Sequence, residues 1–94
     1  MTIYAVSYRY DPTDPRIAEA RPDHRAFIAG LKDEGKIIGS GPHPDAEGGA
    51  LIVIRVDDGE DPASVMDADP FHVRGVLDDR AIREWNPVIN VWDD

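Results

Sequence analysis

Cysteine is absent from this 94-residue chain, which excludes a disulfide framework, a thiol nucleophile and every cysteine-based metal site. Basic residues are few: ten lysines and arginines stand against nineteen aspartates and glutamates, a formal net charge of −9. The ten are scattered along the sequence, so nucleic-acid binding is not expected. No apolar run approaches the roughly 20 residues of a membrane span, and the first ten residues lack the order of a signal peptide. We therefore expect a cytoplasmic protein with no membrane association.

The chain has the length of one domain, and we expect residues 1–94 to form a single core. Hydrophobic residues make up 41% and charged residues 31%, the balance of a globular protein. A domain of this size buries only about 60–65% of its unfolded surface. Its core is therefore thin, and oligomerisation would supplement it.

Four segments have the β-branched and aromatic composition of strands. They are residues 2–10, 36–41, 50–56 and 81–92, the last bent at Pro87. Residues 50–56 (ALIVIRV) place Leu51 and Val53 on one face and Ile52 and Ile54 on the other. Because both faces are apolar, both should be covered.

Two helices are predicted, at about residues 22–34 and 62–68, each with proline at its first position. In the first, His24, Phe27, Ile28 and Leu31 have the spacing of one helical face. The second should end at Asp69, since the following proline disfavours helical geometry. Residues 71–76 would add one short helical turn.

The order strand, helix, strand, strand, helix, strand predicts an α+β, ferredoxin-like split βαβ fold with a four-stranded antiparallel sheet. Two helices cover one face of such a sheet. A second copy of the chain is the simplest cover for the other, which we expect to include Tyr4, Val6 and Tyr8. We predict a two-fold homodimer through the sheet faces, burying about 800 Å² or more per subunit.

His24 begins an otherwise apolar helical stripe, so its imidazole should point towards the sheet. One interpretation is a core histidine hydrogen-bonded to a backbone carbonyl. The other is an imidazole at the rim of the helix–sheet interface, where its ordinary pKa suits proton transfer near neutral pH.

Asp69 is the second candidate, because a carboxylate at a helix C-terminus meets the negative end of the helix dipole. A cationic or hydrogen-bonding partner would explain it, whereas an ordinary solvated helix end would need none. Gly41-Pro42 is the third. A rigid turn at a strand end lets backbone approach a ligand closely, although most such turns are only turns.

These segments together resemble the YCII-related family. Arg21–His24, Gly41-Pro42 and Ala68–Phe71 are similar to its three signature segments, in the same order and with similar separations. The resemblance implies a dimeric α+β barrel in which two sheets pack face to face. It also implies a histidine–aspartate pair in a pocket, here His24 and Asp69. This chain lacks the long insert that some relatives carry between the second and third strands.

The family includes a dehydrochlorinase of a chlorinated hydroxylated aromatic, and muconolactone isomerases share its fold. The resemblance therefore implies cofactor-independent proton transfer, as isomerisation, elimination or dehydration, on a small cyclic or aromatic compound. The expected catalytic residues are His24 and Asp69. The expected substrate-binding residues, two of them arginines suited to an anionic group, are Arg21, Gly41, Pro42, Phe71 and Arg74.

Two alternatives stay open. His24, His43, Asp69 and His72 offer metal ligands, but no two of them form a recognised motif, so we assign no metal. A non-catalytic module that binds or senses a small molecule is the stronger alternative, because one fold hosts many functions. Replacing His24 would abolish turnover in an enzyme and only alter affinity in a binding module.

Overall fold

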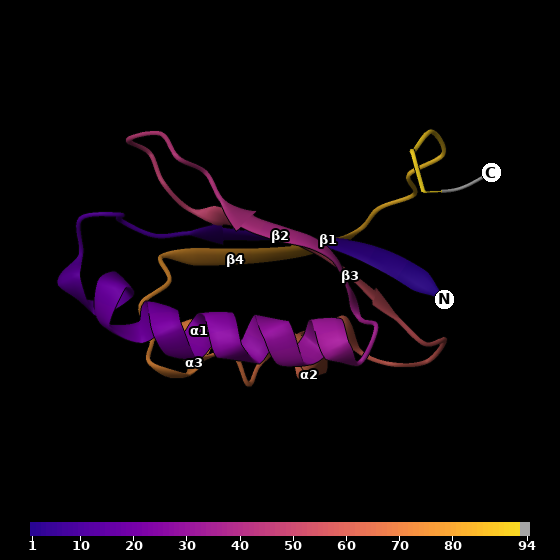
Figure 1. The fold of residues 1–94 in the computed structure, drawn as a ribbon, viewed down its shortest axis with the longest axis horizontal. Coiled ribbons are helices and arrows are strands. Elements are labelled where there is room, and N and C mark those ends of the chain that lie inside the picture. The colour runs from indigo at the N-terminus through magenta and orange to yellow at the C-terminus, as the bar shows by residue number, and fades with distance from the viewer. Residues whose placement is uncertain (93–94) are drawn as a thin grey trace.

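The computed structural model describes residues 1–92 and has the predicted ferredoxin-like order of elements (Figure 1). Its strands and helices are β1 (Thr2–Arg9), α1 (Pro15–Asp33), β2 (Ile37–Pro42), β3 (Ala50–Val56), α2 (Pro62–Met66), α3 (Pro70–Val73) and β4 (Asp79–Glu84). The sheet order is β2-β3-β1-β4, and every neighbouring pair is antiparallel. The α+β fold with four antiparallel strands is thereby confirmed.

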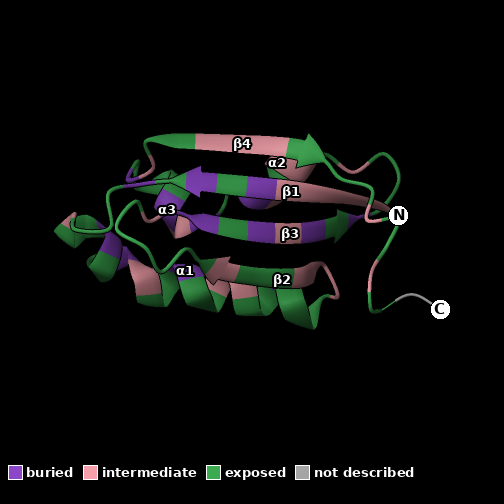
Figure 2. Ribbon diagram, turned by 90° about the horizontal axis from the view of Figure 1, so that it is seen from above, coloured by how far each residue is buried: buried purple, intermediate pink, exposed green. Residues whose placement is uncertain are grey.

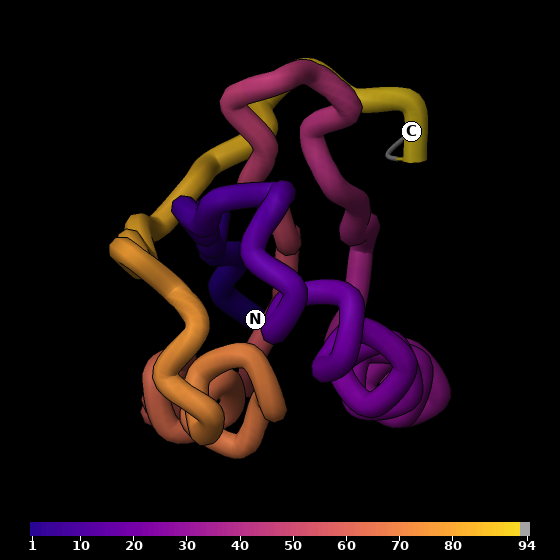
Figure 3. Tube along the Cα trace, turned by 90° about the vertical axis from the view of Figure 1, so that its left-hand side faces the viewer, coloured from indigo at the N-terminus to yellow at the C-terminus, as the bar shows by residue number. Residues whose placement is uncertain are grey.

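All three helices lie on the same face of the sheet (Figures 1 and 3). Viewed along the strands in Figure 3, α1 and the α2–α3 segment lie side by side beneath it. The central strands alternate along their length, so that Val6, Ile52 and Ile54 are fully buried against the helices (Figure 2). This two-layer packing forms the hydrophobic core.

The prediction that Val6 and Tyr8 belong to the uncovered face is wrong. Both are buried in the helix-side core, with Tyr4 packed against it. Strand residues alternate between faces, so the uncovered face takes Ile3, Ala5 and their β3 neighbours instead. We call the side of the sheet opposite the helices the open face, carrying Ile3, Ala5, Leu51 and Val53.

Helix α1 begins seven residues earlier than the predicted Pro22, at Pro15. The Asp14 side chain caps it by accepting a hydrogen bond from the Arg16 N–H. The aspartate and proline residues that suggested a loop therefore supply the cap and the first helical position. Pro22 lies inside the helix, and Ala18, whose carbonyl it cannot bond, is exposed to solvent.

The predicted second helix and last strand are both too long. Helix α2 ends at Met66, and the predicted helical turn after it is α3. Strand β4 spans Asp79–Glu84 rather than residues 81–92, because β1 provides no partner beyond its first residues. The Trp85 N–H still bonds the Ile3 carbonyl, and the chain then leaves the sheet before Pro87. Five apolar residues that were expected in the strand are exposed: Trp85, Val88, Ile89, Val91 and Trp92.

Helices that are both long and apolar enough to cross a bilayer are absent from residues 1–92.

Candidate active site

Asp69 is the N-cap of α3, not the C-terminus of the preceding helix. Its backbone is extended, Pro70 occupies the first helical position, and Oδ1 accepts a hydrogen bond from the Phe71 N–H at 3.1 Å. A carboxylate suits an N-cap, so the unfavourable helix dipole expected from the sequence does not arise. Pro70, which was expected to end the preceding helix, instead begins α3.

The Asp69 carboxylate is completely buried and fully engaged. Besides the Phe71 N–H, it accepts a hydrogen bond from the Tyr8 hydroxyl at 2.8 Å on Oδ2. Both carboxylate oxygens face Nδ1 of His24, at 2.9 and 2.8 Å. A buried carboxylate is costly without such partners, and three donors from three separate elements compensate it here.

His24 therefore lies beside Asp69 although 45 positions separate them in the sequence. The residue is 8% exposed, and its ring stacks on Phe71 with centroids 4.1 Å apart and planes 7° from parallel. Because Nδ1 faces the carboxylate, it carries the hydrogen of that bond, and Nε2 is the nitrogen left to face a ligand. A core histidine bonded to a backbone carbonyl was one interpretation of the sequence. That partner is wrong, because the imidazole bonds the Asp69 carboxylate.

Tyr8 is the residue of this cluster that sequence reasoning missed. Burial raises the pKa of the Tyr8 hydroxyl far above its usual value, and the negative charge of Asp69 and the hydrogen bond to it act in the same direction. The hydroxyl therefore stays protonated and donates. The available signal was its place in the alternating β1 pattern, since a buried tyrosine hydroxyl usually needs a partner.

A cavity of about 150 Å³ opens beside His24, between α1, β2 and α3. Five of the predicted site residues line it: Arg21, His24, Gly41, Pro42 and Phe71. Asp69 lies behind the imidazole and does not line it. Arg74 does not line it either, and its guanidinium pairs with Asp23 instead. The lining residues not predicted from the sequence are Tyr10, Arg25, Ile28, Ser40 and Ala50.

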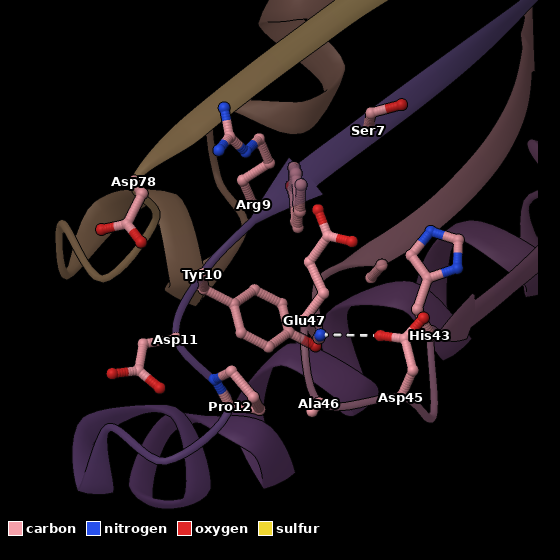
Figure 4. Close-up of a pocket in the computed structure, with 13 residues that line it drawn as sticks. Ser7, Arg9, Tyr10, Asp11, Pro12, His43, Asp45, Ala46, Glu47 and Asp78 are labelled. Atoms are coloured by element: carbon pink, nitrogen blue, oxygen red, sulfur yellow. Dashed lines mark hydrogen bonds between the residues drawn. The ribbon is translucent and has the colours of Figure 1, made fainter.

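A larger hollow of about 580 Å³ lies at the end of β1, under the connection between β2 and β3 (Figure 4). Arg9, His43 and Glu47 project around it, and Asp45 accepts a hydrogen bond from the Gly48 N–H. Except for Tyr8 and Tyr10, its polar side chains are exposed or half-buried, and neither His24 nor Asp69 lines it. The smaller cavity is therefore the candidate site, because the imidazole of the buried His24–Asp69 pair lines it.

Within residues 1–92 no three histidine or acidic side chains are grouped to hold a metal ion. Of the ligands considered from the sequence, His43 lines the larger hollow, and His72 lies 3.7 Å from Asp67 at the surface. His24 and Asp69 instead use their facing atoms on each other.

The sheet, the helices on one face and the cavity at their rim define a ferredoxin-like α+β domain with a ligand-sized pocket. The sequence model of the YCII-related domain matches residues 2–86, and the chain belongs to this family. A similar solved structure is 5-chloro-2-hydroxyhydroquinone dehydrochlorinase from Burkholderia phenoliruptrix AC1100, in complex with 2,5-dihydroxybenzoquinone. The two share 18% sequence identity with a TM-score of 0.75, over 89% of this chain and 93% of the other. No curated protein sequence matches the chain.

Proposed function

We propose that the protein is a cofactor-independent enzyme in which His24 and Asp69 transfer protons on a small, single-ring, anionic compound. One observation carries the proposal: Nδ1 of His24 is fixed by the buried Asp69 carboxylate, while the same imidazole lines a cavity. A histidine that only filled the core would not present its second nitrogen to a ligand-sized space. Imidazole is the side chain that most often serves as a general base or acid at neutral pH.

The chemistry follows from the hydrogen-bond directions. Neutral His24 keeps its hydrogen on Nδ1, so Nε2 presents a lone pair to the ligand. That lone pair accepts a proton from the ligand, and Asp69 stabilises the resulting imidazolium without taking its proton. The electron pair left on the ligand expels a leaving group in an elimination, or moves within the ring in an isomerisation. The imidazolium then returns a proton to product or solvent.

The proposed substrate class is supported by the walls of the cavity. Phe71, Pro42 and Ile28 provide apolar surface, and Arg21 provides a positive charge. A volume of about 150 Å³ is of the order that admits a benzene ring. The structurally similar dehydrochlorinase, whose complex holds a dihydroxybenzoquinone, is consistent with a hydroxylated ring.

We also propose that the protein is a homodimer formed through its open faces. Leu51, on the central strand β3, is 40% exposed, and Ile3, Ala5 and Val53 are only half-buried. An exposed apolar patch on a sheet is a liability for a monomer and a natural interface for a copy. The dimer would seal the second side of the central strands.

The proposed function is tested with 5-chloro-2-hydroxyhydroquinone as a probe and chloride release as the readout. We expect the wild-type protein to release chloride and His24→Asn to lose the activity by about 10²-fold or more, the usual contribution of a general acid or base. Arg16→Gln changes an exposed residue outside the cavity and serves as a control. Equal rates in the wild type and His24→Asn would reject the assigned role of the histidine.

A further inference from the structure

Two arginines flank His24 on the side of α1 that faces the cavity. Arg21, His24, Arg25 and Ile28 have the spacing i, i+3, i+4, i+7, and all four line the cavity. Residues with this spacing share one face of a helix. The helix therefore presents two guanidinium groups at the rim of the cavity, one on either side of the imidazole along the chain.

These two cations lack the neutralising partners that others have. Arg16, Lys36, Arg74 and Arg80 each form an ion pair with a carboxylate. Across residues 1–92, neither Arg21 nor Arg25 forms an ion pair or a side-chain hydrogen bond. Within the described residues, the guanidinium groups of Arg21 and Arg25 are therefore not neutralised by a carboxylate and are available to an anion bound in the cavity that they line.

Like charges four residues apart on a helix repel and destabilise it by a few tenths of a kcal/mol. Arg21 and Arg25 therefore make an unfavourable pair in the free protein, and a bound anion would relieve the repulsion. A structural role does not explain the pair. Residues selected for binding commonly reduce the stability of the protein that carries them.

We propose that Arg21 and Arg25 bind the carboxylate of a single-ring aromatic acid and hold its ring beside Nε2 of His24. This inference rests on the proposed function and names the substrate class of the same site. A guanidinium presents a planar fork of donors that matches the two oxygens of a carboxylate. The ring would lie against Phe71 and Pro42, which supply the apolar wall.

Equilibrium binding tests the proposal without requiring turnover. Isothermal titration with benzoate and with neutral benzamide compares two ligands of the same shape that differ in charge. We expect the wild type to bind benzoate at least about tenfold more tightly, since hydrogen bonds to charged groups contribute on that scale. Arg21→Gln and Arg25→Gln should each remove at least about tenfold of the benzoate affinity and change benzamide binding less than twofold.

Two further measurements separate a binding role from a structural one. Arg16→Gln removes the same charge from α1 outside the cavity, and its benzoate affinity should equal that of the wild type. The ligand-free melting temperatures of Arg21→Gln and Arg25→Gln should match or exceed the wild-type value, because the repulsion is gone. A lower melting temperature with equal losses for benzoate and benzamide would overturn the proposal in favour of a structural role.

The remaining outcomes are also decisive. Equal affinities for benzoate and benzamide, or no binding of either, would overturn the anion site. Binding of 4-nitrophenolate but not benzoate would overturn the carboxylate assignment. The proposed function fails separately, because it is judged by the loss of turnover in His24→Asn, a variant that should keep its affinity for benzoate.

Discussion

The rings of His24 and Phe71 lie parallel, 4.1 Å between centroids. The same Phe71 donates its backbone N–H to the Asp69 carboxylate that holds the imidazole. One residue thus fixes the ring of the histidine and the oxygen of its partner. The short helix α3 is the element that brings both contacts against α1.

Asp69→Asn should reverse the tautomer of His24. An asparagine in place of the carboxylate can donate its amide hydrogen to Nδ1, which then has to be the acceptor. Nitrogen-15 NMR of the histidine ring should show the hydrogen on Nδ1 in the wild type and on Nε2 in the variant. Activity should fall, since Nε2 would no longer offer a lone pair. Retention of the Nδ1–H tautomer in Asp69→Asn would contradict this arrangement.

Tyr8→Phe removes one donor from the buried carboxylate and should lower the free energy of unfolding by about 1–3 kcal/mol. Urea denaturation at neutral pH measures it. Tyr10→Phe is the matched control, because Tyr10 is also buried in the core but its hydroxyl does not bond Asp69. Equal losses of unfolding free energy in the two variants would mean that the Tyr8–Asp69 hydrogen bond does not contribute to stability.

The stability difference between the wild type and Tyr8→Phe should also depend on pH. The folded-state pKa of Tyr8 is raised, chiefly by burial, so below about pH 10 the hydroxyl is protonated in both states and its contribution is complete. Above that pH the unfolded chain ionises Tyr8 while the folded protein does not. The wild-type advantage should then decline by up to about 1.4 kcal/mol per pH unit. Urea denaturation of both proteins between pH 9 and 11 measures this decline. A stability difference between the wild type and Tyr8→Phe that widens as the pH rises would contradict the prediction.

Gly49→Ala should destabilise the protein more than Gly59→Ala. Both glycines have φ of +83°, where an alanine costs about 1 kcal/mol. A Cβ at Gly49 would also clash with the Tyr8 carbonyl oxygen, whereas nothing lies within 4 Å of a Cβ at Gly59. Thermal unfolding should show the larger loss at Gly49, where β3 begins beside the strand that carries Tyr8. Equal losses would mean that the backbone yields at no cost.

Leu51→Asp should convert the proposed dimer to a monomer, because it places a charge on a central strand of the open face. Ala18→Asp adds the same charge on the exposed surface of α1 and should leave the oligomeric state unchanged. Light scattering at micromolar concentration distinguishes the two. A wild-type protein that is already monomeric would refute the dimer.

Much of the fold was predictable because the strongest local signals agreed with it. The alternation in β1 and β3 and the helical spacing around His24 were enough to place the sheet and α1. The start of α1 could not be predicted, since Asp14-Pro15 has the composition of a turn as well as of a helix cap. The end of β4 depends on where β1 runs out of partners, which is a tertiary property.

The site was predictable in its residue types and less so in its geometry. His24 and Asp69 stand out because an imidazole begins an apolar stripe and a carboxylate precedes a proline. The dipole argument for Asp69 was wrong, because α2 ends at Met66 and Asp69 is the N-cap of α3. Tyr8 and Arg25 were missed because their roles arise only when β1, α1 and α3 meet.

Proton exchange between His24 and a bound ligand is the central claim, and solvent deuterium exchange tests it most directly. The wild type and His24→Asn would be incubated in deuterated buffer with hydroxylated and carboxylated single-ring compounds, and ring hydrogens followed by proton NMR. We predict that the wild type catalyses deuterium incorporation into, or conversion of, at least one compound. His24→Asn should still bind that compound but should catalyse its exchange or conversion about 10²-fold more slowly. Bound ligands whose ring hydrogens never exchange, or equal rates in both proteins, would contradict the account.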